Sequence, residues 1–218
     1  MIKRFERTYG YDARMIMGQS RYLYALSSTE DFYDMEGWLE RGGYKGSVIL
    51  FFDIGNGKVY EPFSIKKNVL YSEPVFFDGS IWFLRGDFDQ EMITLVRYLP
   101  GGEPEAIVRL KTDDVDLYNL KLMGEGVNIT SQNGESFKCY YPDRFSFAIG
   151  PRMSVQLIKE DRVYISEWHE EGWDDKNNCA GDDYSYYENV IVKDRKGNTL
   201  SCEKGSLCQT PDGIWLIS

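Results

Sequence analysis

The sequence predicts an all-β protein built from repeated four-stranded units, and three observations support this prediction. Aromatic residues make up 15% of the 218 residues, and Tyr, Phe and Trp favour strands over helices. Short apolar runs alternate with Gly, Asn and Asp, a pattern typical of strands joined by tight turns. A polar turn followed by a hydrophobic-aromatic-hydrophobic run recurs at residues 20–26, 78–84, 161–166 and 212–217. With one degenerate copy, this spacing indicates a unit of about 40–50 residues.

The units follow one another along the chain and contain hairpins whose turns carry Asn or Gly, because tight hairpin turns require positive φ. In the clearest unit we expect strands at 72–77, 80–85, 92–99 and 105–110. The third unit is degenerate, since Gly124 and Gly126 interrupt its second strand. Helical periodicity is weak, and the best candidate helix covers residues 31–40. The predicted units are about 11–65, 69–110, 115–150 and 151–206, followed by a shorter piece at 207–218.

The shorter piece at 207–218 holds only two strands and therefore has an open edge, which proteins rarely leave unpaired. Residues 1–10 form a strand-like segment that belongs to no unit. We expect this N-terminal strand to pair with the last piece, which would complete a fifth unit and close the units into a ring.

In these four-strand units and this closing strand, the chain resembles the β-propeller repeat proteins of the TolB-like and tachylectin-like kind. The resemblance implies one β-propeller domain over residues 1–218, with about five four-stranded blades and a ring closed by an N-terminal strand. A jelly roll or another β-sandwich is the structural alternative. A β-sandwich would not require similar sequence patterns at repeating intervals.

Two long segments, 29–46 and 169–189, interrupt the regular spacing between the second and third strands of their units. In a propeller both loops emerge on one rim. Both mix aromatic and acidic residues, and such aromatics can stack on a sugar or anchor a protein interface. The alternative is that the aromatics fold inward and cap the loops' own clusters. The candidate ligand-binding residues are Trp38, Tyr44, Trp168, Trp173, Tyr184 and Tyr186.

These loops favour a binding or scaffolding module for a protein partner or a carbohydrate, rather than an enzyme. We assign no catalytic residue, because the nucleophile, phosphate-loop and dinucleotide motifs are absent from the sequence. The single histidine, His169, is expected to be a surface residue. The alternative function is a glycosidase-like enzyme that uses carboxylates near the propeller axis. Its candidate residues are Asp53, Asp87, Asp116 and Glu167.

Charge and cysteine content restrict the partners further. A net charge of −10 without a basic cluster argues against nucleic acid. The longest apolar run, 47–52, is too short to span a bilayer, and we expect a cytoplasmic protein with reduced thiols and no membrane contact. No cofactor or metal site is expected, and nothing indicates a particular oligomeric state. The acidic run 174–183 fails the EF-hand pattern, and an irregular calcium site there is the weaker alternative to a solvated loop.

Overall fold

The computed structural model describes residues 2, 4–174 and 176–218, and it confirms the predicted all-β class. The described residues contain nineteen strands, one α-helix, α1 (Asp34–Glu40), and one 3-10 turn, η1 (Thr112–Asp114). All the strand pairs are antiparallel, and they form five separate sheets, which we name A to E in chain order. No closed barrel and no closed propeller ring is formed by these sheets in the described part of the chain.

Strands that follow one another in sequence lie side by side in each sheet, apart from the first two strands of sheet B, so the sheets are meanders. Sheet A contains β1 (Arg14–Met15), β2 (Tyr22–Leu26), β3 (Ile49–Asp53) and β4 (Val59–Tyr60). Sheet B contains β5 (Val69–Tyr71), β6 (Val75–Phe77), β7 (Ser80–Asp87), β8 (Met92–Tyr98) and β9 (Glu105–Lys111), with both β5 and β6 paired to β7. Sheet C contains β10 (Lys121–Met123), β11 (Asn128–Asn133), β12 (Ser136–Tyr141) and β13 (Phe145–Ala148).

Sheets D and E complete the chain. Sheet D contains β14 (Met153–Lys159), β15 (Arg162–Asp174), β16 (Cys179–Asp194) and β17 (Thr199–Lys204), and sheet E contains β18 (Leu207–Gln209) and β19 (Trp215–Ile217). In every copy the recurrent aromatic pattern lies on the strand that is second in the spatial order of its sheet, at Tyr24, Trp82, Tyr164 and Trp215. The repeated sequence thus corresponds to a repeated structural position.

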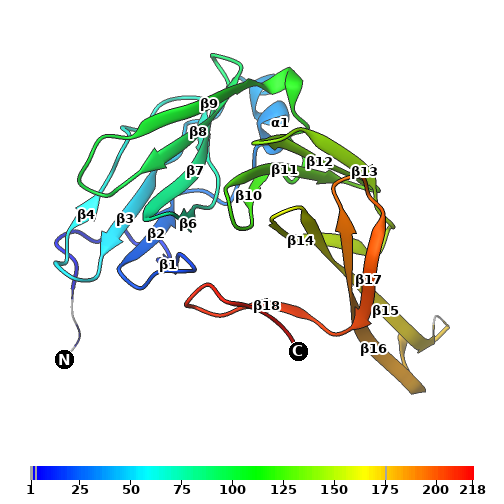
Figure 1. Ribbon diagram of the computed structural model, residues 1–218. Coiled ribbons are helices and arrows are strands. Elements are labelled where there is room, and N and C mark those ends of the chain that lie inside the picture. Colours follow the sequence, from blue (N-terminus) through cyan, green and yellow to red (C-terminus); the bar gives the residue numbers. More distant parts are fainter. Residues whose placement is uncertain (1, 3, 175) are drawn as a thin grey trace.

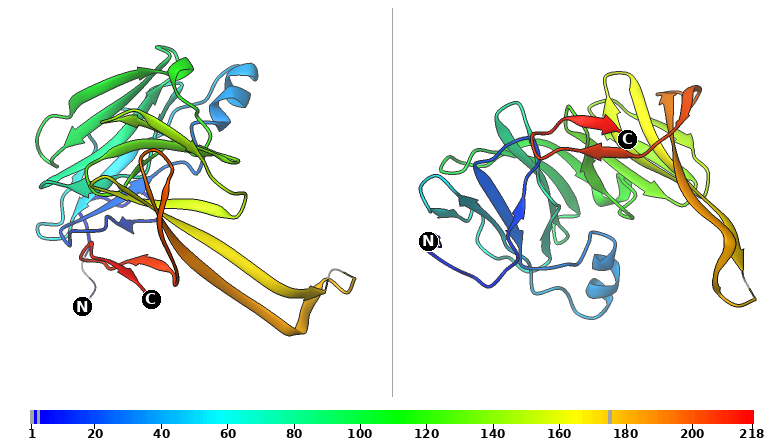
Figure 2. Two further views of the ribbon diagram at one scale, coloured as in Figure 1. Left: turned by 45° about the vertical axis from the view of Figure 1, so that its right-hand side comes forward. Right: turned by 90° about the horizontal axis from the view of Figure 1, so that it is seen from below.

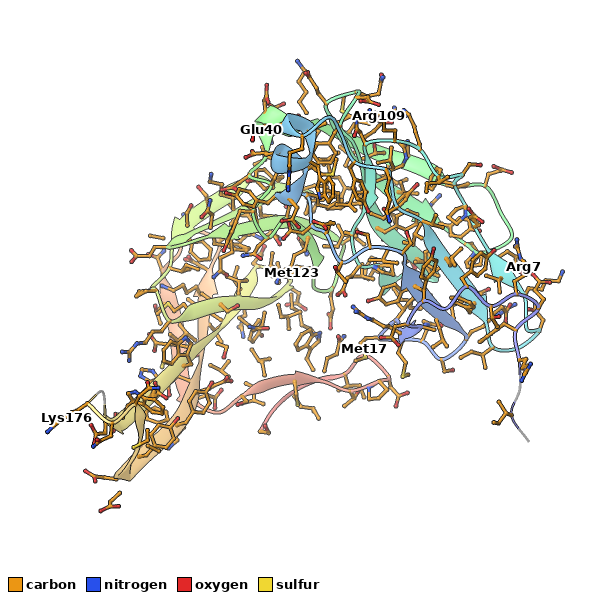
Figure 3. All side chains as sticks on the ribbon, turned by 180° about the vertical axis from the view of Figure 1, so that it is seen from behind. Arg7, Met17, Glu40, Arg109, Met123 and Lys176 are labelled. Carbon is orange, nitrogen blue, oxygen red and sulfur yellow. The ribbon has the colours of Figure 1, made fainter. Side chains whose placement is uncertain are left out.

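The four larger sheets follow one another in an arc, as Figure 1 shows, and sheet E runs across the open side of the arc. The strands β1, β6 and β10 lie toward the middle, whereas β4, β9 and β13 lie at the periphery. Met123, at the end of β10, lies on the inner side, and Arg109 of β9 lies on the outer rim (Figure 3). The chain therefore passes from the inside to the outside within each of these sheets.

The hydrophobic core is divided into layers between neighbouring sheets. One layer joins sheets A and B through residues such as Phe51 and Phe83, whose ring centroids are 5.7 Å apart. A second joins sheets B and C, and a third joins sheets C and D around Phe137. Alternation along β7 directs Phe83 toward sheet A and Leu84 toward sheet C, so sheet B is covered on both faces.

The C-terminal hairpin, rather than an N-terminal strand, connects the two ends of the arc. The amide of Gly18, in the turn between β1 and β2, donates a hydrogen bond of 3.0 Å to the carbonyl of Pro211 in the β18–β19 turn. Met17, beside this turn, lies next to the C-terminal hairpin in Figure 3. Sheet E thereby bridges from sheet D to sheet A.

The expected pairing of residues 1–10 with the last strand is corrected by the structure. The described residues of this segment form no strand, and they lie along sheet A. Glu6 donates its amide to the carbonyl of Gly57 (2.9 Å) and accepts the Val59 amide (3.0 Å), while Phe5 packs on Phe52. The segment pairs there because β4 leaves its backbone groups free beside an apolar surface.

Candidate functional site

The strongest candidate for a recognition surface is a two-stranded ribbon that projects beyond sheet D (Figure 2, left). The sequence prediction of a loop at 169–189 is wrong, because β15 and β16 continue through it as a hairpin. Trp168 lies opposite Glu188, His169 opposite Tyr187, and Glu170 opposite Tyr186. The short alternation Tyr184-Ser185-Tyr186 is a local signal for a strand in this segment.

Four of the predicted binding residues come together on one face of this ribbon, which we call the aromatic face: Trp168, Trp173, Tyr184 and Tyr186. Trp168 and Glu170 share that face because side chains two apart on a strand point the same way, and Tyr186 lies directly opposite Glu170. A register shift after Glu171 brings Trp173 against Tyr184, with ring centroids 6.1 Å apart. The four aromatic residues are between 38% and 57% exposed.

Two carboxylates hold the phenols of the aromatic face. The Tyr184 hydroxyl donates to Glu170 Oε1 at 2.8 Å, and the Tyr186 hydroxyl donates to Glu188 Oε1 at 3.2 Å. The hydrogen bond to Glu170 raises the pKa of Tyr184, and desolvation together with Glu188 raises the pKa of Tyr186. Both phenols therefore stay protonated, and the remaining carboxylate oxygens can accept hydrogen bonds from a partner.

The opposite face of the ribbon carries a polar network around His169. The imidazole stacks on Tyr187 at 4.8 Å between ring centroids, and its Nε2 lies 2.9 Å from Glu167 Oε2 and 2.9 Å from Asn189 Nδ2. The Lys204 ammonium lies 4.4 Å from the centroid of Tyr187. Because each of these groups already has a neighbour, this face stiffens the base of the ribbon.

The acidic tip of the ribbon is a turn stabilised by its own carboxylate. Asp174 accepts hydrogen bonds from the amides of Lys176 and Asn177 and from the Asn177 side chain, and these bonds lower the pKa of Asp174. No group of three or more His, Cys, Asp or Glu side chains is placed to hold a metal ion within the part of the chain that the structure describes. Asp175, part of the calcium alternative, lies outside the described residues.

The other predicted segment, 29–46, folds inward. It contains α1, whose Met35 is fully buried, and Tyr44 is only 2% exposed. Trp38 is half-buried and packs on Tyr44 at 5.5 Å between ring centroids. Trp38 and Tyr44 therefore lie apart from the aromatic face and serve the core, as the inward alternative expected. Seen from below (Figure 2, right), α1 and the ribbon tip still project from the same side of the molecule.

A central cavity of about 1050 Å³ lies between the inner strands of sheets A, B and C and the segment 29–46. Trp38 and Tyr44 line it, together with Arg14 of β1, Glu73 before β6, and Lys121 of β10. Sequence reasoning did not find this cavity, because its charged residues come from three different units and form no local motif.

The four carboxylates considered for a glycosidase do not line this cavity. Asp53 pairs with Arg21 at 2.8 Å, and Asp87 pairs with Lys66 and Arg85. Asp116 accepts from the Asn133 side chain at 3.2 Å, and Glu167 contacts His169. These carboxylates belong to different sheets or connections and have different partners, so they do not form a pair.

The chain matches no protein-family model, and neither the search of curated proteins nor the search of solved structures found a similar protein. Within the described residues, no helix is long and apolar enough to cross a membrane.

Proposed function

We propose that this protein is a binding module that docks a basic protein surface onto the aromatic face of its β15–β16 ribbon. The observation that carries the proposal is the placement of Trp168, Trp173, Tyr184 and Tyr186 on one exposed face. Trp and Tyr are the residues that most often dominate binding energy at protein interfaces. Four of them on a single two-stranded element provide anchors whose rotamers are already restricted by Glu170 and by each other.

The negative charge of the ribbon supports a basic partner over a neutral one. Residues 167–189 contain eight Asp and Glu residues and one Lys, so much of the net charge of the chain is concentrated on the ribbon. Glu170 and Glu188 lie on the aromatic face itself, beside the rings. A surface that combines carboxylates with exposed rings suits Arg and Lys side chains, whose cations pair with the former and stack on the latter.

We propose further that the ribbon stands on a five-bladed propeller, in which sheets A to D are four blades and sheet E is part of a fifth. The meander order of each sheet, the inner position of β1, β6 and β10 and the apolar layers between neighbouring sheets support this arrangement. A propeller would hold the ribbon rigidly at its base, because β15 and β16 are central strands of sheet D.

The test is binding of the full chain to arrays of Lys/Arg-rich peptides, Asp/Glu-rich peptides and glycans, followed by titration calorimetry on the best peptide. We expect the basic peptides to bind, with an affinity that falls as salt increases. The double variant Trp173→Ala/Tyr186→Ala should weaken binding at least tenfold, which is typical of the loss of a hot-spot aromatic.

The matched control is Tyr187→Ala, which removes an aromatic ring from the opposite face of the same strand. This variant should retain the affinity of the wild type. Binding of glycans in preference to basic peptides, or equal loss in the control, would contradict docking through the aromatic face.

A further inference from the structure

The central cavity is a second concave site, independent of the ribbon. Its volume of about 1050 Å³ lies at the upper end of the range for small-molecule sites, which is about 300–1,000 Å³. The walls come from β1, β2, the segment 29–46, β5 with the residues before β6, and the start of β10. Three sheets thus contribute to one concave site, and the segments that connect their strands form most of its wall.

Most of the acidic side chains in the cavity already have partners. Glu73 Oε1 lies 2.7 Å from Arg14 Nη1, and Asp12 Oδ2 lies 3.6 Å from Arg14 Nε. The carboxylate of Asp31 accepts the amides of Tyr33 and Asp34 at the start of α1. Asp12 and Glu73 keep exposed carboxylates beside Arg14, and Glu30 is the remaining carboxylate of the wall.

Two lysines of the wall, Lys45 and Lys121, are placed differently. Neither forms a salt bridge or a side-chain hydrogen bond with any described residue, although the chain as a whole is acidic. Desolvation lowers the pKa of Lys121, and the nearby charge of Glu73 only partly opposes this effect. Both lysine side chains remain exposed on the cavity wall, so their ammonium groups are accessible to an anion that enters the cavity.

The other residues of the cavity wall suit a ligand that contains a ring. Phe32, Trp38 and Leu122 supply apolar contacts, and Tyr24 lies on the same wall beside Glu73 and Arg14. Burial, with the adjacent charge of Glu73, raises the pKa of Tyr24 to about 12, so that this hydroxyl keeps its proton at neutral pH. The hydroxyls of Ser28 and Thr29 lie on the same wall and can hydrogen-bond a polar ligand.

We propose that the central cavity binds a sugar-sized organic anion, with its carboxylate or phosphate held by Lys121 and Lys45 and its ring against Phe32 and Trp38. This activity is separate from docking at the ribbon, because none of the aromatic-face residues lines the cavity.

The test is titration calorimetry of the full chain with three probes: D-glucuronate, D-glucose 6-phosphate and D-glucose. At least one of the two anions should bind ten times more tightly than the neutral sugar, and comparison of the two anions distinguishes a carboxylate site from a phosphate site. Equal affinity for D-glucose, or no heat with either anion, would overturn the proposal.

Variants then locate the site. Lys121→Met should reduce anion affinity at least tenfold, and Lys121→Arg should restore most of it because the charge returns. The control is Lys111→Met, on the outer strand β9, which should bind as the wild type does. Wild-type affinity in Lys121→Met would overturn the assignment.

A measurement on the unaltered chain does not depend on the folding of any variant. Because desolvation lowers the pKa of Lys121 below the ordinary lysine value of about 10.4, anion affinity should fall as the pH rises from 7 to about 11 and the ammonium loses its proton. Constant affinity over this range would contradict the role of Lys121. Binding of basic peptides to the ribbon should be unchanged in Lys121→Met, which separates the two proposals.

Discussion

Single residues that carry ionisable or reactive groups serve the fold in several places, and one of them, Asp53, was a candidate for the glycosidase alternative. Asp53 is fully buried, accepts hydrogen bonds from Arg21 and from the amides of Gly55 and Asn56, and so closes the turn after β3. Cys139 is buried, and burial raises the pKa of its thiol to about 11, which makes it unreactive at neutral pH. At this scale, burial and local partners decide the role of a residue.

Asp53 and Asp87 should make the free energy of unfolding depend on pH in the acidic range. The hydrogen bond from Arg21, with those from the turn amides, lowers the pKa of Asp53, and Lys66 and Arg85 outweigh desolvation to lower that of Asp87. A carboxyl group with a lowered folded pKa stabilises the protein above the ordinary Asp pKa of about 3.9, and this contribution disappears as the pH falls through the folded pKa. The free energy of unfolding should therefore decrease from about pH 5 toward pH 2.

The variant Asp53→Asn should lose about 1–3 kcal/mol at pH 7, because the charged acceptor of Arg21 is removed. It should also show a smaller decrease at low pH than the wild type. Urea denaturation at pH 7 and pH 3 measures both effects, with the exposed Glu103→Gln as the control. The same acid dependence in Asp53→Asn and the wild type would disprove this role.

At the scale of elements, the two long insertions differ in structure: one packs into the core and the other forms an exposed hairpin. The segment 29–46 turns inward because Phe32, Met35 and Tyr44 extend the core layer between sheets B and C. The insertion at 169–189 remains extended because its alternating residues pair across a hairpin. Gly86 shows how closely the first insertion packs, since a Cβ there would lie 2.8 Å from the ring of Phe32.

Met35→Ala tests the inward packing of the first insertion. Met35 is fully buried, and truncation of a buried Met costs about 2–5 kcal/mol through lost burial and a cavity. The control is Leu39→Ala, on an exposed position of the same helix, which should cost less than about 1 kcal/mol. Thermal and urea denaturation measure the difference, and equal losses in the two variants would show that α1 lies on the surface.

At the scale of the whole molecule, one close contact between two turns joins the ends of the arc. Gly213 has φ +87°, and a Cβ there would lie 2.9 Å from the Cα of Gly18. This approach allows the Gly18 amide to reach the Pro211 carbonyl. Sheet E has only two strands of its own, so this contact is the main backbone tie between sheet E and sheet A.

Gly213→Ala should separate the C-terminal hairpin from sheet A. The matched control is Gly79→Ala, because Gly79 has φ +72° with no atom within 4 Å of a new Cβ, and both variants share the cost of a positive φ. Only Gly213→Ala should lose hydrogen-exchange protection at Gly18 and at residues 206–218. Protection that survives in Gly213→Ala would show that the hairpin is held by other contacts.

The sequence by itself determined the all-β class, the hairpin turns and the grouping of strands into sheets. These features depend on neighbours in the chain: positive φ at turn residues such as Gly79, and period-two alternation within strands such as β7. The mixture of aromatic and acidic residues in and beside the insertion at 169–189 was sufficient to select Trp168, Trp173, Tyr184 and Tyr186 as candidates, although not to show that they share a face.

Tertiary structure alone decided the rest. It placed the N-terminal segment on sheet A, buried Tyr44, and gave Asp53 a structural partner. It also brought Arg14 into contact with Glu73, which is 59 residues away in the sequence. Both residues line a cavity that no local sequence motif predicts. The physical reason is that contacts between sheets join residues that are distant in sequence, and their burial and pairing follow from how the sheets pack against one another.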